Sequence, residues 1–214
     1  MTEWVEGGVR RSDTRSRQAL SSYNHQFMAD SPYTDDELVE QCKQGQKEAF
    51  AAVYYRYRTR IFSFCLTLVR NPSDAEDALQ DVFRYIFSKL RYYESKGRFK
   101  SFIFKIAHST SIDILRRRSK QAVMPEEFEI PVEETERPRA EQIEQLRICI
   151  AKLPPMYREI MALRVLDDLA YEEISDVLDL PLGTVKSRIH HAVSLVRKML
   201  RSFKREPWSE GEEA

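Results

Sequence analysis

Two clusters of Lys and Arg dominate the chemistry that this sequence could perform. Residues 96–120 hold eight Lys and Arg and one Asp, and residues 186–205 hold seven Lys and Arg and no acidic residue. Either cluster alone could be the solvated face of one helix. Two such clusters, each at the end of a helical segment, favour a protein that binds a polyanion at two separate sites.

The overall charge of the chain is zero, which at first sight argues against a polyanion as partner. The 214 residues hold 34 Lys and Arg against 34 Asp and Glu, whereas proteins that bind nucleic acids usually carry a basic excess. The zero is a sum of unequal parts, because residues 121–146 have a net charge of −6 and residues 147–185 one of −3. We therefore interpret the chain as two polyanion-facing surfaces offset by acidic segments.

Other kinds of functional site find no support in the sequence. The three cysteines, Cys42, Cys65 and Cys149, are scattered, so we expect small core residues in a reducing compartment rather than disulfides or a metal site. The four histidines have no metal-ligand spacing, and no paired carboxylates stand out near the basic clusters. We expect no catalytic residue, no metal and no cofactor. No apolar run is long enough for a membrane span or a signal peptide, so we expect a cytoplasmic protein.

The apolar residues recur at gaps of three and four, which is typical of amphipathic helices, and strand-type alternation is absent. Capping boxes at Thr34–Glu37 and Ser73–Glu76 are expected to begin two of the helices. Both folded parts are therefore predicted to be all-α. Helices are predicted within residues 34–70, from 73 to about 90, from 99 to 118, from about 139 to 153, and over 157–166, 171–178 and 184–203.

The segment 171–189 is typical of a helix-turn-helix. Its two helices are expected to meet at Asp179, a residue type that tolerates a left-handed backbone better than most. The second helix is expected to begin near Thr184, where its free N–H groups could meet a phosphate. The side chains of its early turns lie where a recognition helix meets bases and phosphates; they are Lys186, Ser187, Arg188, His190 and His191. A helical hairpin with a basic face is the simpler alternative.

The predicted architecture is two helical domains joined by an acidic linker. Residues 119–138 hold three Pro and six Glu and cannot bury enough apolar surface to fold alone. They separate an N-terminal helical bundle (30–118) from a C-terminal helix-turn-helix domain (139–205). Residues 1–29 are predicted to be a flexible arm, and residues 206–214 an acidic tail.

Several motifs resemble one protein family, the extracytoplasmic-function (ECF, group 4) sigma factors of bacterial RNA polymerase, within the sigma-70 family. The segments 153–164 (LPPMYREIMALR), 171–174 (YEEI) and 182–188 (LGTVKSR) are similar to the C-terminal domain of the family. The segment 74–83 (DAEDALQDVF) resembles the part that docks on polymerase, and 99–107 (FKSFIFKIA) with 113–118 (DILRRR) resembles the part that reads and opens the −10 element.

The resemblance implies a transcription initiation factor without catalytic residues. Its implied partners are promoter DNA, the clamp helices and flap of core RNA polymerase, and an anti-sigma factor. The −10 element would be contacted by Tyr93, Lys96, Arg98, Lys100, Phe102, Lys105, His108, Ser109, Arg116 and Arg117. The −35 element would be contacted by Thr184, Lys186, Ser187, Arg188, His190 and His191. Polymerase would be bound by Asp74, Asp77, Gln80, Asp81 and Phe83.

Some of these residues have a structural alternative. Phe102 could pack in the core, and Arg116 and Arg117 could form a solvated helix end where cations suit the helix dipole. Ala170 stands where the family usually has a Ser that caps the next helix.

Two other functions are alternatives to transcription initiation. A LuxR-type one-component regulator carries a similar helix-turn-helix, but it would need a sensor or receiver domain, and residues 35–118 have no alternating strands. An enzyme acting on nucleic acid would need a nucleophile motif or a metal cluster, and the sequence offers neither.

Overall fold

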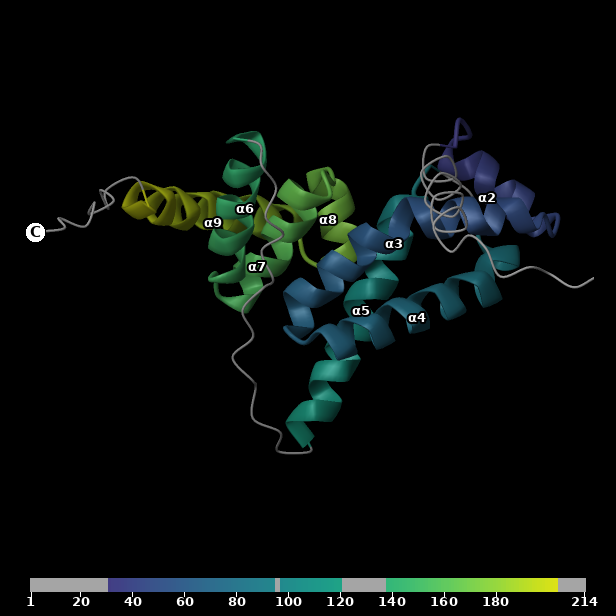
Figure 1. Cartoon of the computed structure of the whole chain (residues 1–214), viewed down its shortest axis with the longest axis horizontal. Helices are drawn as coiled ribbons and strands as arrows, with labels where there is room; N and C mark the ends of the chain where they lie inside the picture. The colour runs from purple at the N-terminus through teal and green to yellow at the C-terminus, as the bar shows by residue number, and fades with distance from the viewer. Residues whose placement is uncertain (1–30, 95–96, 121–137, 204–214) are drawn as a thin grey trace, which may run out of the picture.

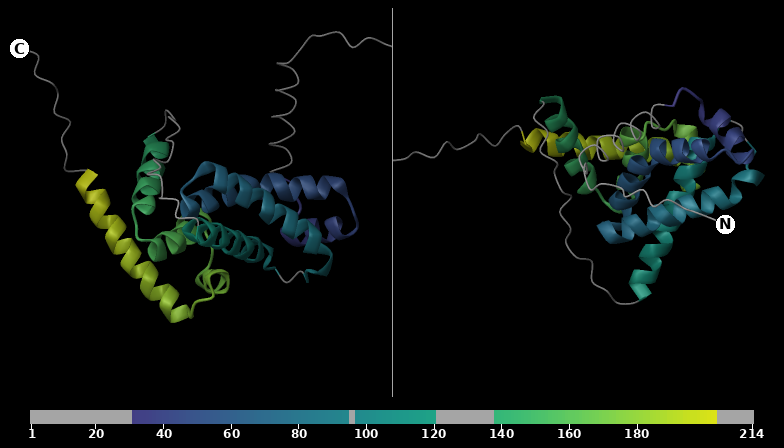
Figure 2. Two further views of the ribbon diagram at one scale, coloured as in Figure 1. Left: turned by 90° about the horizontal axis from the view of Figure 1, so that it is seen from below. Right: turned by 45° about the vertical axis from the view of Figure 1, so that its right-hand side comes forward.

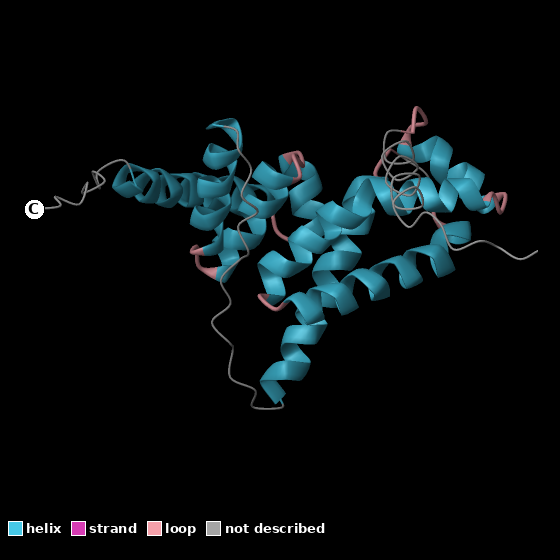
Figure 3. Cartoon of the chain, in the orientation of Figure 1, coloured by secondary structure: helices cyan, strands magenta, loops and turns pink. Residues whose placement is uncertain are grey.

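The computed structural model describes residues 31–94, 97–120 and 138–203, and every regular element among them is helical (Figures 1 and 3). This confirms the all-α fold class. The predicted arm (1–29), nearly all of the predicted linker (119–138) and the acidic tail (206–214) lie outside the described residues.

Four helices and one short 3-10 turn form the N-terminal bundle. They are α2 (Asp35–Lys43), α3 (Lys47–Val69), α4 (Pro72–Lys89), the turn η1 (Leu90–Tyr92) and α5 (Phe99–Lys120). α2 and α3 are separated at Gly45, whose φ of 81° is a left-handed conformation that a side chain disfavours. α3 packs against α2, α4 and α5 and is the central helix of the bundle (Figure 2).

The N-terminus of α2 follows the prediction and that of α4 does not. Thr34 and Glu37 form the expected capping box, with Thr34 N donating to Glu37 Oε2 (2.7 Å) and Glu37 N to Thr34 Oγ1 (3.3 Å). The box predicted at Ser73 is wrong, because Asn71 caps α4 by accepting from Asp74 N (3.0 Å). Pro72 explains the shift, since its fixed φ and missing N–H suit the first position of a helix.

Aromatic side chains fill the core of the N-terminal bundle. Phe64 of α3 and Phe104 of α5 are fully buried and meet edge to face, with ring centroids 5.4 Å apart. Tyr57 is also buried, and its hydroxyl donates to the Asp35 carboxylate at the start of α2. A buried phenol needs such a partner, so this bond fixes α2 against α3.

The C-terminal bundle contains the predicted helix-turn-helix. Its elements are α6 (Pro138–Ala151), α7 (Pro155–Met161), the π-helical turn η2 (Ala162–Leu166), α8 (Tyr171–Leu178) and α9 (Leu182–Phe203). Asp179 between α8 and α9 has φ 54°, which confirms the left-handed turn. The helix predicted over 157–166 begins two residues earlier and ends in the π-helical turn.

The two bundles pack against each other, α5 on α8 and α3 on α7 and η2 (Figures 1 and 2). At the centre of this contact Arg60 of α3 donates from Nε to Asp167 Oδ1 (3.0 Å) and from Nη2 to Asp167 O (2.6 Å). Arg158 of α7 is buried and donates to Leu153 O in its own bundle and to Thr67 O of α3 (3.3 Å). This contact was not predicted from the sequence.

The N-terminus of α8 offers a simple test of helix capping. Ala170 N donates to Glu173 Oε2 (2.7 Å), but Ala170 has no side-chain oxygen to accept from the first turn in return. We expect Ala170→Ser to raise the free energy of unfolding by about 1 kcal/mol, because it completes the box. Thr34→Ala, which opens the complete box of α2, should lower it by a similar amount. Urea denaturation measures both, and a neutral Ala170→Ser would contradict the expected cap.

Asp167 should make stability depend on pH. Burial raises its pKa to about 6, although the cations of Arg60 and Lys100 lower it. The folded chain therefore binds a proton near pH 5 that the unfolded chain does not, so this carboxyl adds stability as pH falls from 7 to 5, by about 1 kcal/mol. Unfolding free energies at both pH values should differ less in Asp167→Asn than in the wild type. Equal pH dependence in the two proteins would contradict this.

Candidate nucleic-acid and polymerase interfaces

The first turns of α9 present the predicted −35 residues on one exposed surface. Val185 and Ile189 are buried in the C-terminal bundle, so Lys186 and Ser187, which follow Val185, point away from it. Lys186 and His190 are exposed, as are Ser187 and His191. Members of each pair are four residues apart and lie on one side of the helix. Thr184 is half-buried at the helix start.

Arg188 differs from the other predicted −35 residues. Its side chain is half-buried, and its Nη1 lies 3.8 Å from Glu159 Oε1 of α7. In this arrangement Arg188 contributes to the packing of α9 on α7. Consecutive residues of a helix point 100° apart, so Arg188 can face α7 while Ser187 faces the solvent.

Tyr93 and Phe102 form an aromatic pair beside the loop that leads into α5. Their rings stack with centroids 4.6 Å apart, and Tyr93 also meets Phe99 edge to face at 5.7 Å. Phe99 is fully buried, whereas Tyr93 and Phe102 are half-buried. Burial, and then the carboxylates of Asp36 and Asp35, raises the pKa of Tyr93, so it is a neutral phenol. The two rings form an aromatic surface beside the loop that leads into α5. Lys96, in this loop, lies outside the described residues.

The C-terminal bundle contacts part of the predicted −10 surface, although the side chain of Arg98 remains 71% exposed. The contacting residues lie along α5 and at its start, and each meets an oxygen atom of the other bundle; Ser101 among them was not a predicted −10 residue. The pairs are Arg98 Nη1 with Asp176 Oδ2 (3.3 Å), Lys100 Nζ with Asp168 O (3.0 Å), Ser101 Oγ with Glu173 Oε1 (3.2 Å) and His108 Nε2 with Glu159 Oε2 (3.3 Å). Burial, and then the nearby Arg60, lowers the pKa of Lys100.

The remaining −10 candidates divide between two sides of α5. Lys105, Ser109 and Arg116 line a pocket of about 240 Å³ between α5 and the C-terminal end of α8. Arg117 lines a different pocket, of about 300 Å³, between α5 and α4. The structure therefore separates Arg117 from its neighbour Arg116 and places it among the polymerase candidates.

The polymerase candidates lie on α4 with unequal exposure. Asp77 and Gln80 are exposed and Asp81 is half-exposed, and all three line the pocket that holds Arg117. Asp74 is engaged within the bundle, because its carboxylate accepts from Arg118 Nη1 (2.8 Å).

Phe83 was predicted to bind polymerase, yet its ring is part of the core in this conformation. It is only 4% exposed and contacts the rings of Tyr54 and Phe87 at 4.8 and 5.6 Å. Its position on α4 explains this, because it follows Ala75, Ala78 and Val82 on the buried stripe of the helix.

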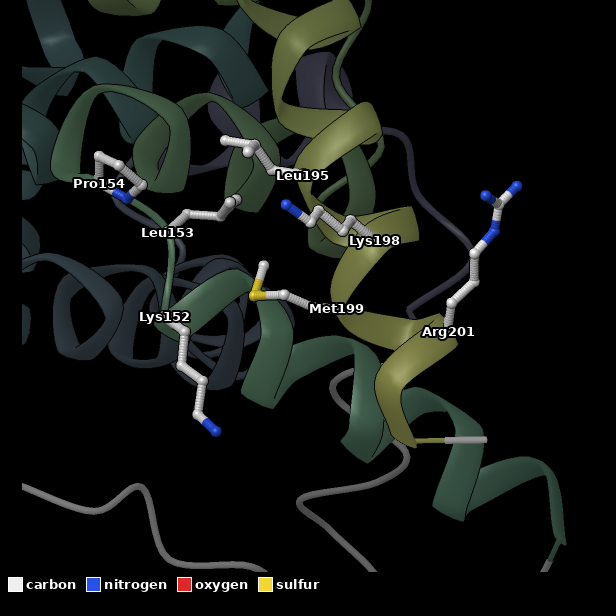
Figure 4. A pocket seen from close by; sticks show the side chains of 7 residues that line it. All are labelled: Lys152, Leu153, Pro154, Leu195, Lys198, Met199 and Arg201. Atoms are coloured by element: carbon white, nitrogen blue, oxygen red, sulfur yellow. The ribbon is translucent and has the colours of Figure 1, made fainter. Parts of the chain in front are cut away.

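A groove in the C-terminal bundle was not predicted from the sequence. It has a volume of about 660 Å³ and lies between the segment that joins α6 to α7 and the last turns of α9 (Figure 4). Apolar side chains of Leu153, Leu195 and Met199 line it together with the cations of Lys198 and Arg201. In the sequence Leu195 is one apolar residue of the helix among others, and its exposure is seen only in the structure.

The acidic residues that face α5 were also missed as functional residues. The only signal in the sequence was the net charge of −3 over residues 147–185, which is unusual beside a DNA-binding helix.

The three cysteines are buried as predicted, and burial raises the pKa values of Cys42 and Cys65 to about 11. Over the described part of the chain, no group of three His, Cys, Asp or Glu residues is placed to hold a metal ion. None of the described helices is long and apolar enough to cross a membrane.

Comparison with known proteins identifies the family to which this chain is similar. The family described as sigma-70 region 2 matches residues 53–121, and that described as sigma-70, region 4 matches residues 143–196. The chain is 28% identical over 187 residues to the ECF RNA polymerase sigma factor SigW of Bacillus subtilis, covering 77% of this chain and 96% of that protein. It is 31% identical over 174 residues to the ECF RNA polymerase sigma-E factor of Escherichia coli K12, covering 74% and 90%.

Two solved structures share the fold. The sigma factor RpoE in complex with the anti-sigma factor NepR, from Bartonella quintana, has a TM-score of 0.60 at 21% identity, with 71% of this chain and 96% of that chain covered. CnrH in complex with the cytosolic domain of CnrY has a TM-score of 0.57 at 20% identity, covering 78% and 97%. The LuxR-type alternative is not favoured, because both sigma-70 regions match in order along one chain. The protein belongs to the ECF sigma factors of the sigma-70 family.

Proposed function

We propose that this alternative sigma factor binds core RNA polymerase through α4, reads and opens the −10 element with α5, and reads the −35 element with the first turns of α9. The observation that carries the proposal is the match of sigma-70 regions 2 and 4 to the two bundles, each with its own cationic helix. It follows that the chain acts by binding and carries out no catalysis of its own, and that it works in the cytoplasm with polymerase and promoter DNA.

The −10 assignment rests on the chemistry that strand opening requires. An unstacked base needs an aromatic surface, which contributes about 1–3 kcal/mol per base, and the strand needs cations along its backbone. Tyr93 and Phe102 supply half-exposed rings. Arg98, Lys100 and Lys105 lie on α5 or just before it and supply the charges.

Two surfaces are proposed for polymerase. The exposed carboxylates of α4 suit a basic surface such as the clamp helices. The groove of Figure 4, with apolar side chains beside cations, suits an apolar segment with acidic neighbours, which we propose is the flap. An anti-sigma factor is a further proposed partner, since the solved relatives RpoE and CnrH were captured with NepR and CnrY.

The function is tested by reconstituted run-off transcription with core polymerase and the purified chain. Initiation at a defined promoter is expected only when both are present. Specific binding to duplex DNA without polymerase, together with no initiation, would favour a regulator instead.

Lys186 tests the −35 surface. Lys186→Glu places a carboxylate where a phosphate or guanine should lie, so we expect transcription from a −35-dependent promoter to fall roughly tenfold or more. Binding to core polymerase should not change. The matched control is Arg147→Glu, which makes the same charge change at an exposed position of α6. Equal losses in both variants would show a general effect of charge.

Asp77 tests the polymerase surface. Asp77→Lys reverses an exposed charge on α4, and we expect the affinity for core polymerase to fall roughly tenfold, mostly through slower association. Glu48→Lys, at an exposed position near the start of α3, makes the same charge change away from α4. Surface plasmon resonance with immobilised core polymerase measures both, and undiminished binding of Asp77→Lys would contradict the assignment.

A further inference from the structure

We infer that the groove of Figure 4 is the binding site of the chain's own acidic tail (206–214), with the indole of Trp208 in the groove, and that the tail competes there with the polymerase flap. The competition rests on the function proposed for the groove, whereas its occupation by the tail does not. The tail itself lies outside the described residues, so the argument starts from the groove.

The groove combines an apolar base with a cationic side. Leu153 is buried, whereas Leu195 is a large apolar side chain that is 38% exposed. Lys198 and Met199 point from α9 toward the segment that holds Leu153 (Figure 4). No carboxylate lines the described part of the groove. A segment that fits it should therefore present one large apolar side chain with acidic residues close by.

The acidic tail has this composition. Residues 206–214 hold four Glu and no Lys or Arg, and Trp208 is their only aromatic residue. An indole buries a large apolar surface, and Glu206 and Glu210 flank it at two residues on either side. Pro207, directly before Trp208, disfavours continuation of α9. The tail thus places carboxylates on both sides of one apolar side chain, as the groove requires.

The tail is attached where it can reach the groove. α9 ends at Phe203, and the five residues from there to Trp208 span up to about 17 Å when extended. Met199 and Leu195 precede Phe203 by four and eight residues, which correspond to about 6 and 12 Å of helix. Trp208 can therefore fold back onto either side chain while α9 stays intact.

Tethering makes a weak contact sufficient. A segment joined through a few residues acts at an effective concentration on the order of millimolar, so a contact that is weak between separate molecules still fills the groove. The flap would then bind only while the groove is open, and its apparent affinity falls in proportion to the open fraction. The tail is therefore expected to weaken the binding of polymerase without preventing it.

The test follows Trp208 by fluorescence in the full chain carrying Trp4→Phe, which leaves Trp208 as its only tryptophan. An indole in the groove is shielded from the neutral quencher acrylamide. Lys198→Glu places a carboxylate in the groove, so the quenching constant should rise roughly twofold as the open fraction grows. The matched control is Arg197→Glu, the same charge change at an exposed position of α9 that does not line the groove; it should leave quenching unchanged.

A second matched pair tests the apolar contact. Leu195 and Val165 are each 38% exposed, but Leu195 lines the groove and Val165, in η2, does not. Leu195→Ser should therefore raise the quenching of Trp208, and Val165→Ser should not. Circular dichroism should show unchanged helix content in all variants; if one groove variant loses helix, the other pair decides. Shielding that disappears on dilution would assign the groove to the tail of a second copy and overturn the inference.

Surface plasmon resonance with immobilised core polymerase measures the competition. Trp208→Ala removes the apolar anchor of the tail, so the affinity should rise roughly fivefold, whereas loss of a direct polymerase contact would lower it. If Trp208→Ala binds no more tightly than the wild type, competition with the flap is wrong.

The quenching result is independent of the proposed function. Equal quenching within either pair of correctly folded variants shows that the tail does not occupy the groove and overturns the inference, even if run-off transcription succeeds. If run-off transcription fails, the proposed function falls whatever the quenching shows.

Discussion

The ion pair between Arg60 and Asp167 lies at the centre of the contact between the two bundles. Arg60 cannot easily turn elsewhere, because its guanidinium also lies over the rings of Tyr57 and Phe104, 6.0 and 5.7 Å from their centroids. Asp167 ends the π-helical turn η2, so the pair joins the core of one bundle to the turn that precedes the helix-turn-helix of the other. Arg158 adds a second link by donating to Thr67 O at the end of α3. Two arginines, one from each bundle, thus reach across the same contact.

This contact gives the zero net charge a structural meaning. The acidic excess of residues 147–185 is not spread evenly over the C-terminal bundle, because Glu159, Asp167, Glu173 and Asp176 all face the N-terminal bundle. Asp176 pairs with Arg98 and Asp167 with Arg60, while Glu159 lies between His108 of α5 and Arg188 of α9. Lys186 and His190 on the outward surface of α9 are exposed. The acidic residues of the C-terminal bundle therefore offset part of the positive charge of residues 96–120.

The sequence predicted the helices well because helix periodicity and caps are local properties. The apolar stripe of α4 and the left-handed Asp179 each follow from a few neighbouring residues. Local competition explains the errors, since Asn71 displaced Ser73 as a cap once Pro72 took the first helical position. A charge cluster, by contrast, does not say which way each side chain points. Arg116 and Arg117 differ by 100° around α5, and only the position of α4 and α8 shows that they serve different surfaces. The contact of Arg60 with Asp167 joins residues 107 positions apart and leaves no periodic signal.

The two uses that we propose for α9 are separated along its length. Lys186 and the histidines after it occupy the first turns, whereas Leu195, Lys198 and Met199 line the groove near its end. Twelve residues of helix separate Lys186 from Lys198, which corresponds to about 18 Å. A duplex at the first turns and a protein segment in the groove can therefore bind α9 together without competing.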